Sequence, residues 1–128
     1  MQEKKNPLSP HLQIYRWQIS SLLSITHRIV GVINILAISA ICFWSLFLLL
    51  GAESYEVLNN FFNSFFGKFI AVGLCWTFSF HILNELRHLF WDMGYGFDLK
   101  ISRITGVLAL IGSFVLTILF YLIGKNIF

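Results

Sequence analysis

The sequence predicts an all-α membrane protein with three transmembrane helices. Its composition is strongly apolar, and its charged residues lie outside three long hydrophobic runs. Of its 128 residues, 57% are hydrophobic and 17% aromatic, whereas 12% are charged. The mean hydropathy is +0.76. Lipid is the expected solvent for such a chain, and its net charge of +3 does not call for a nucleic-acid partner.

Each predicted span is built around a stretch without charged residues. The stretch from Ile29 to Ala52 is long enough, at about 1.5 Å per residue, to cross about 30 Å of hydrocarbon. The stretch from Phe69 to Asn84 is shorter, so its span must include polar residues at its ends. The expected spans are residues 22–50, 65–90 and 103–125, in one domain of residues 1–128. Three helices enclose little interior, so we expect their polar faces to contact partner subunits or a cofactor.

The basic residues divide unequally between the two sides of the membrane. One side carries Lys4, Lys5, Arg16, Arg28, Arg87, Lys100 and Arg103, and the other carries Lys68 and Lys125. This bias predicts a cytoplasmic N-terminus. The connection between the first two spans is expected to be an outer loop that carries a phenylalanine-rich run at 61–66. We see no cleaved signal or transit peptide, which favours a bacterial inner membrane, with the mitochondrial inner membrane as the alternative.

Polar residues of the first span share one helical stripe near the cytoplasmic side. Ser24, His27, Arg28 and Gly31 follow at spacings of three, one and three, and Asn34 roughly continues the stripe. A charge at this depth is costly unless it is paired or hydrated, which favours a functional role for Arg28. The alternative for Arg28 is an end-anchor that reaches the lipid phosphates. For Ser24 the alternative is a hydrogen bond to a carbonyl of its own helix.

The second span carries its own stripe, Gly73, Thr77, His81, Glu85 and His88. Among these, His81 lies inside the uncharged run, where a neutral imidazole needs either a hydrogen-bond partner on another helix or a metal. The two axial ligands of one haem iron approach from opposite faces of the porphyrin. His81 and His88 share a helix face and differ in depth by about 10 Å, so they cannot bind one haem together.

His27 is expected near the depth of His88, and therefore poorly placed to oppose His81. A second axial ligand would have to come from another subunit, while His27 and Arg28 suit the haem propionates. No C-x-x-C-H motif occurs, so a haem would be held without covalent attachment. The third span carries small residues on one face, which predicts close helix packing: Gly106, Ala109, Gly112, Ser113 and Thr117.

Three ordered motifs resemble those of the cytochrome b556 subunits of succinate dehydrogenase, of the alphaproteobacterial and mitochondrial type. The motifs are Pro7-Leu8-Ser9-Pro10-His11 with Ile14-Tyr15, then Ser24-x-x-His27-Arg28, then His81 followed by Arg87-His88-Leu89-x-Trp91-Asp92-x-Gly94. Together they cover nearly the whole chain. The resemblance implies a membrane anchor of respiratory complex II that packs with a second anchor subunit around haem b.

The resemblance also implies a role for each matching residue. His81 would be the axial ligand of haem b, with the other ligand supplied by the second membrane anchor. Ser24 and Arg28 would bind ubiquinone, and His27 with Arg28 would contact the haem propionates, while His88 and Asp92 would be structural. The further partners would be a flavoprotein with FAD, which oxidises succinate, and an iron–sulfur subunit. No succinate site is expected in this chain.

Three residues depart from the family pattern. Asn6 stands where an Arg is usual, Val30 where a Ser or Thr is usual, and Glu85 where a small residue is usual. Glu85 puts a carboxyl on the stripe of His81, and we expect it to pair with Arg28 or another nearby cation, or to turn towards the lipid headgroups. Two functions compete with the main one, a quinol:fumarate reductase anchor and a haem-free structural anchor. A transporter is disfavoured because the charged stripes stay at one end.

Overall fold

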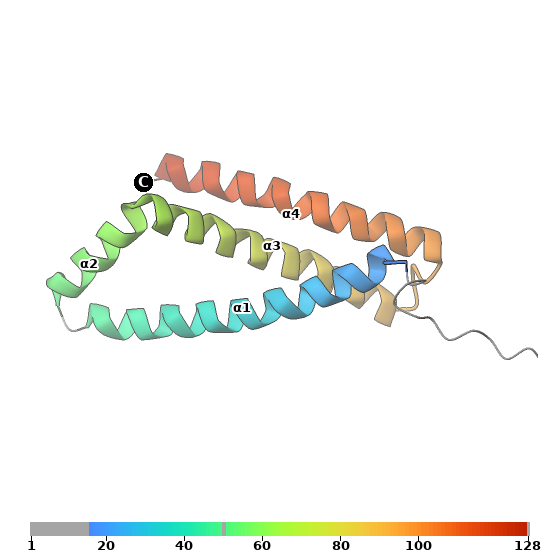
Figure 1. Cartoon of the computed structure of the whole chain (residues 1–128), viewed down its shortest axis with the longest axis horizontal. Coiled ribbons are helices and arrows are strands. Elements are labelled where there is room, and N and C mark those ends of the chain that lie inside the picture. Colours follow the sequence, from blue (N-terminus) through green and yellow to red (C-terminus); the bar gives the residue numbers. More distant parts are fainter. Residues whose placement is uncertain (1–15, 50, 128) are drawn as a thin grey trace, which may run out of the picture.

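The computed structural model describes residues 16–49 and 51–127, and within these ranges every regular element is an α-helix (Figure 1). The helices are α1 (Ile19–Leu48), α2 (Ala52–Asn63), α3 (Phe65–Asp92) and α4 (Leu99–Ile127). The motif at 7–11, Ile14-Tyr15, and the two N-terminal lysines lie outside the described residues.

Three of the helices are long and apolar enough to cross a membrane, which confirms the predicted fold class. They are α1 with 30 residues, α3 with 28, and 27 residues of α4 from Leu99 to Lys125. At 1.5 Å per residue these lengths are about 40–45 Å, more than the hydrocarbon core requires. The helices therefore begin earlier than the apolar runs: α1 starts at Ile19 rather than 22, and α4 starts at Leu99 rather than 103.

Helix α3 packs against both α1 and α4 (Figure 1). The start of α1, the end of α3 and the start of α4 lie at the same end of the molecule, which we call the basic end because it carries the described members of the predicted inner cations, Arg16, Arg28, Arg87, Lys100 and Arg103. The core consists of Leu23, Val30 and Phe80, with Trp76 and Leu110 packed against it. Elsewhere most large apolar side chains are exposed, and only 11% of the most apolar stretch of α1 is buried. A broad face of α1 is thus open to lipid or to another subunit.

The connection between α1 and α3 is the helix α2, where the sequence predicted a loop. Gly51 begins it with a φ of 124°, a conformation that glycine adopts without strain, and Glu53 lies in the first turn, where a negative charge stabilises the helix. Ser64 then caps α3, since its Oγ accepts a hydrogen bond of 3.2 Å from the Gly67 amide. A Cβ on Gly67 would collide with the carbonyl oxygen of Phe61, so the tight junction between α2 and α3 requires glycine.

Small residues let α4 approach its neighbours, as predicted. Gly106, Ala109, Ser113 and Thr117 are buried. A Cβ on Gly106 would collide with Leu23 of α1, and one on Gly112 would lie 3.1 Å from Leu83 of α3. The first half of α4 therefore contacts both other long helices at the basic end.

Candidate functional site

The two predicted stripes face each other across the α1–α3 interface. The imidazole rings of His27 and His81 stack with centroids 4.3 Å apart and planes 5° apart, and the His27 ring lies 5.4 Å from that of His88. His27 thus lies beside His88, as expected, but its ring is also stacked on that of His81 and does not oppose it across a shared iron. Because α1 begins at Ile19, His27 is about 12 Å into its helix, between the depths of His88 and His81.

Glu85 pairs with His27 rather than with Arg28. Its Oε1 accepts a hydrogen bond of 2.9 Å from Nε2 of His27, and lies 3.8 Å from Nε2 of His81. Arg28 follows His27 by about 100° around α1, and its side chain is exposed. Nδ1 of His27 is buried and has no hydrogen-bond partner among the described residues.

Neither ring nitrogen of His81 makes a hydrogen bond within the part of the chain that the structure describes. Its Nδ1 is buried without a partner, and its Nε2 is too far from Glu85 for one. The side chain is 32% exposed, so a nitrogen can reach a group outside the bundle. Gly31 makes room for this ring, because a Cβ there would lie 3.3 Å from Cε1 of His81. This arrangement differs from a histidine satisfied by a neighbouring helix.

His27, His81 and Glu85 hold their ligand atoms within 4.8 Å of one another. A metal ion lies near the plane of each imidazole that binds it. Since the two rings are stacked in parallel planes, one ion cannot lie in both planes. As arranged, the cluster can offer a metal one imidazole, that of His81, rather than a preformed three-ligand centre.

A polar contact one turn deeper joins the same two helices. Thr77 Oγ1 donates to Asn34 Oδ1 at 2.7 Å, and Asn34 Nδ2 donates to the Thr77 carbonyl oxygen at 3.4 Å. Both residues are buried. Asn34 thus continues the stripe of α1, as expected, and holds α1 against α3 beyond the histidine pair.

Ser24 lines a cavity of about 430 Å³ between α1 and α3, which we call the serine cavity. Across it lie Asn84, Arg87, His88 and Trp91 of α3. The Ser24 hydroxyl makes no hydrogen bond to the described residues, so the helix-carbonyl alternative is not the one observed. Arg28 is not among the lining residues, but it lies one turn further along the same face of α1 as Ser24.

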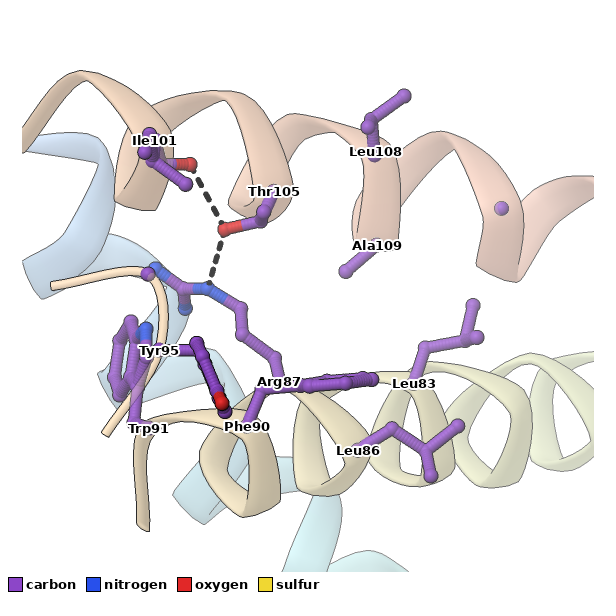
Figure 2. Close-up of a pocket in the computed structure, with 12 residues that line it drawn as sticks. Leu83, Leu86, Arg87, Phe90, Trp91, Tyr95, Ile101, Thr105, Leu108 and Ala109 are labelled. Carbon is purple, nitrogen blue, oxygen red and sulfur yellow. Dashed lines mark hydrogen bonds between the residues drawn. The ribbon is translucent and has the colours of Figure 1, made fainter. Parts of the chain in front are cut away.

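Arg87 is the residue of this region that the sequence argument missed. It is buried, and it joins the end of α3 to the start of α4 (Figure 2). Its Nε donates to Thr105 Oγ1 at 3.2 Å, and its Nη2 donates to the carbonyl and hydroxyl oxygens of Ser102, each at 2.9 Å. Its guanidinium also lies 4.2 Å from the ring centre of Trp91. The sequence carried one sign of this role, since Arg87 and Trp91 are four residues apart and therefore share a helix face on which they can contact each other.

A second cavity, of about 580 Å³, lies between α3 and α4 on the other side of Arg87 (Figure 2). Its walls are mainly apolar and include Leu83, Leu86, Phe90 and Leu108. Arg87 lines both cavities, so its side chain separates a polar space near Ser24 from an apolar space near α4.

Comparisons with known proteins agree along nearly the whole chain. Residues 2–120 match the family model described as succinate dehydrogenase/fumarate reductase transmembrane subunit. The succinate dehydrogenase cytochrome b556 subunit of Rickettsia felis is 42% identical over 117 residues, which cover 91% of each chain. The protein of that name from Paracoccus denitrificans is 34% identical over 88% of this chain and 87% of its own. A succinate dehydrogenase cytochrome b560 subunit of Reclinomonas americana is 35% identical, over 91% and 85%.

Proposed function

Because this chain belongs to the family of succinate dehydrogenase/fumarate reductase transmembrane subunits, as its motifs predicted, we propose that it is the cytochrome b anchor of a succinate dehydrogenase. The observation that carries the proposal is the imidazole of His81, which is accessible and makes no hydrogen bond within the described bundle. The chain would lie in the bacterial inner membrane with its basic end in the cytoplasm.

We propose that His81 would hold the iron of a haem b, which would supply one-electron transfer, and that a second anchor subunit would supply the other protein ligand. Stacking against His27 covers one face of the His81 ring and leaves its edge free. The edge is where a metal would bind, since an imidazole binds a metal in the plane of its ring. Glu85 is 57% exposed and can rotate away from Nε2 of His81. His27 and Arg28 would hold the propionates.

Ubiquinone would bind beside Ser24 and Arg28. Converting two quinone carbonyls to hydroxyls requires two electrons and two protons. Oxidation of succinate to fumarate in the FAD-containing flavoprotein releases two electrons, which would arrive through the iron–sulfur subunit, while the protons come from cytoplasmic water. Ser24 would donate a hydrogen bond to a carbonyl oxygen, and Arg28 would stabilise negative charge on the bound quinone. This chain would hold no succinate site.

Replacement of Arg28 tests the quinone site. Arg28→Leu should lower succinate–ubiquinone activity in the assembled complex and leave reduction of an artificial dye by the soluble subunits unchanged. Arg103→Leu is the matched control, since Arg103 is also exposed at this end but belongs to α4 and not to the face of α1 that carries Ser24. Equal loss of both activities in Arg28→Leu would show an assembly defect and contradict the proposed role.

Replacement of His81 tests the haem site. His81→Leu should remove the b-type band from the reduced-minus-oxidised spectrum of the purified complex. His88→Gln should retain it, because His88 donates through Nδ1 to the Asn84 carbonyl oxygen at 2.7 Å and lies about 10 Å nearer the basic end. A wild-type complex without this band would favour the haem-free anchor.

The family description also covers fumarate reductases, so a quinol:fumarate reductase anchor is the second candidate. The quinone that co-purifies with the complex and the haem midpoint potential separate the two. Ubiquinone and a relatively high potential support succinate oxidation, whereas a low-potential quinone supports fumarate reduction.

A further inference from the structure

The serine cavity is rich in hydrogen-bond donors and has no carboxylate in its wall among the described residues. Its lining consists of three serine hydroxyls, an amide, a guanidinium, an imidazole and an indole, with one isoleucine. The guanidinium, that of Arg87, keeps its proton and hence its positive charge. The cavity is therefore suited to a ligand whose polar atoms are acceptors and can carry negative charge.

The charge of Arg87 is not balanced within the described bundle. Its hydrogen bonds go to Ser102, Thr105 and Asn84, which are all neutral, and its remaining contact is the Trp91 ring. A buried cation at the edge of a membrane is costly when it lacks a counter-charge. A neutral side chain would join α3 to α4 at lower cost, so bracing the two helices does not explain the choice of arginine.

Two residues that line the α3 wall of the cavity, Asn84 and Arg87, have N–H groups without a hydrogen-bond partner among the described residues. A guanidinium has five N–H groups, and the four hydrogen bonds of Arg87 leave one N–H of Nη1 without a partner. Nη1 donates to Oδ1 of Asn84 at 3.4 Å. This fixes the amide orientation, and Nδ2 of Asn84 is then buried without a partner among the described residues. The Ser24 hydroxyl lies on the opposite wall.

We propose that Asn84 and Arg87 form the α3 side of the quinone head-group site. They would donate hydrogen bonds to a quinone oxygen, and the charge of Arg87 would stabilise that oxygen as electrons arrive. The volume of about 430 Å³ is in the range of small-molecule sites, and Ile25 and Trp91 supply apolar surface for a flat ring. The inference rests on the proposed function, which places the quinone at Ser24.

Two substitutions at Asn84 separate hydrogen bonding from charge, each measured in the complete complex in native membranes. Asn84→Leu removes the donors, keeps the volume and leaves Arg87 charged. It should raise KM for a short-chain ubiquinone about tenfold, the effect of one lost hydrogen bond of about 1.4 kcal/mol. Asn84→Asp places a carboxylate beside Arg87 and neutralises its field, so it should also lower kcat about tenfold or more.

Rates are normalised to flavin content, so that incomplete assembly does not imitate a quinone defect. Dye reduction per flavin and the haem spectrum should match wild type. Ser79→Ala is the matched control, because Ser79 is a buried polar residue of α3 whose hydroxyl donates to the Cys75 carbonyl oxygen, away from the cavity. Arg87→Lys is a second test that keeps the charge but loses the fork of hydrogen bonds, and it should retain more quinone turnover than Arg87→Gln.

Wild-type quinone kinetics in both Asn84 variants, together with a raised KM in Ser24→Ala, would overturn this inference and leave the proposed quinone site intact. Wild-type kinetics in Ser24→Ala and Arg28→Leu would overturn the proposed quinone site itself. Equal turnover in Arg87→Lys and Arg87→Gln would show that the charge of Arg87 has no role in the reaction.

Discussion

Removal of the Thr77 hydroxyl should loosen the contact between α1 and α3. The side chains of Thr77 and Asn34 are about 6% and 5% exposed, so water cannot replace the hydrogen bond of 2.7 Å between them. Thr77→Val keeps the side-chain volume and leaves Asn34 Oδ1 buried without its donor. The free energy of unfolding should therefore fall.

The expected loss of unfolding free energy depends on whether the unfolded helices are in water or in lipid. An unsatisfied buried acceptor costs about 1–3 kcal/mol in a water-soluble protein. Interhelical hydrogen bonds in membrane proteins are worth about 0.6 kcal/mol on average and about 1.7 at most, because the unfolded helices find other partners in lipid. Thr77 Oγ1 also lies 2.8 Å from the Leu74 carbonyl oxygen, but a hydroxyl has one hydrogen and cannot donate to both. We expect Thr77→Val to cost about 1–1.5 kcal/mol.

The assay is reversible unfolding of the full chain in mixed micelles with increasing SDS, followed by tryptophan fluorescence. Thr117→Val is the control, because Thr117 is as buried as Thr77 but donates only to the Ser113 carbonyl oxygen of its own helix. It should cost less than about 0.5 kcal/mol, and the double variant with Asn34→Leu should cost less than the sum of its singles. Equal losses in the two threonine variants, or exact additivity, would refute the reasoning.

Three further predictions concern glycines and Glu85. Gly31→Ala should lower the haem content per complex, since its methyl group forces the His81 ring to move by a few tenths of an ångström. Gly73→Ala is the control, because its methyl group enters open space and should leave the haem content unchanged. The haem-to-flavin ratio of each complex measures the difference. Gly67→Ala should destabilise the chain by about 2 kcal/mol or more through its clash with the end of α2, measured by SDS unfolding. Glu85→Gly should change thermal stability or haem content by releasing the imidazole hydrogen bond, and unchanged values for both would refute that role.

The fold was predictable because its strongest signals are local in the sequence. Three charge-free runs sufficed to predict three spans, and small residues in the third predicted its packing. The helix α2 was missed because its residues are on average less apolar than those of the three long helices, and the phenylalanines at 61 and 62 were interpreted as part of a loop. Two helices begin before the predicted spans, at Ile19 and Leu99, because hydropathy locates the hydrocarbon boundary, whereas a helix continues into the headgroup region.

The site was only partly predictable, because stripes show which residues share a face and not which residues meet across it. Ser24, His27, Gly31 and His81 were found by their spacing. His27 was expected near the depth of His88, and sequence spacing did not show that its ring would also stack on His81, which lies on another helix. Arg87 was counted as an inner cation, because its partners lie on another helix.

The short connection between α3 and α4 extends the consequences of the site beyond the cavity. Gly94 and Gly96 have φ values of 87° and 83°, which other residues adopt with strain. Gly96 also lies against the Trp91 ring, which in turn covers the Arg87 guanidinium. A genetic selection for resistance to quinone-site inhibitors should therefore recover changes in this loop as well as in the cavity wall, and a resistance allele at Gly96 would not imply contact with the inhibitor.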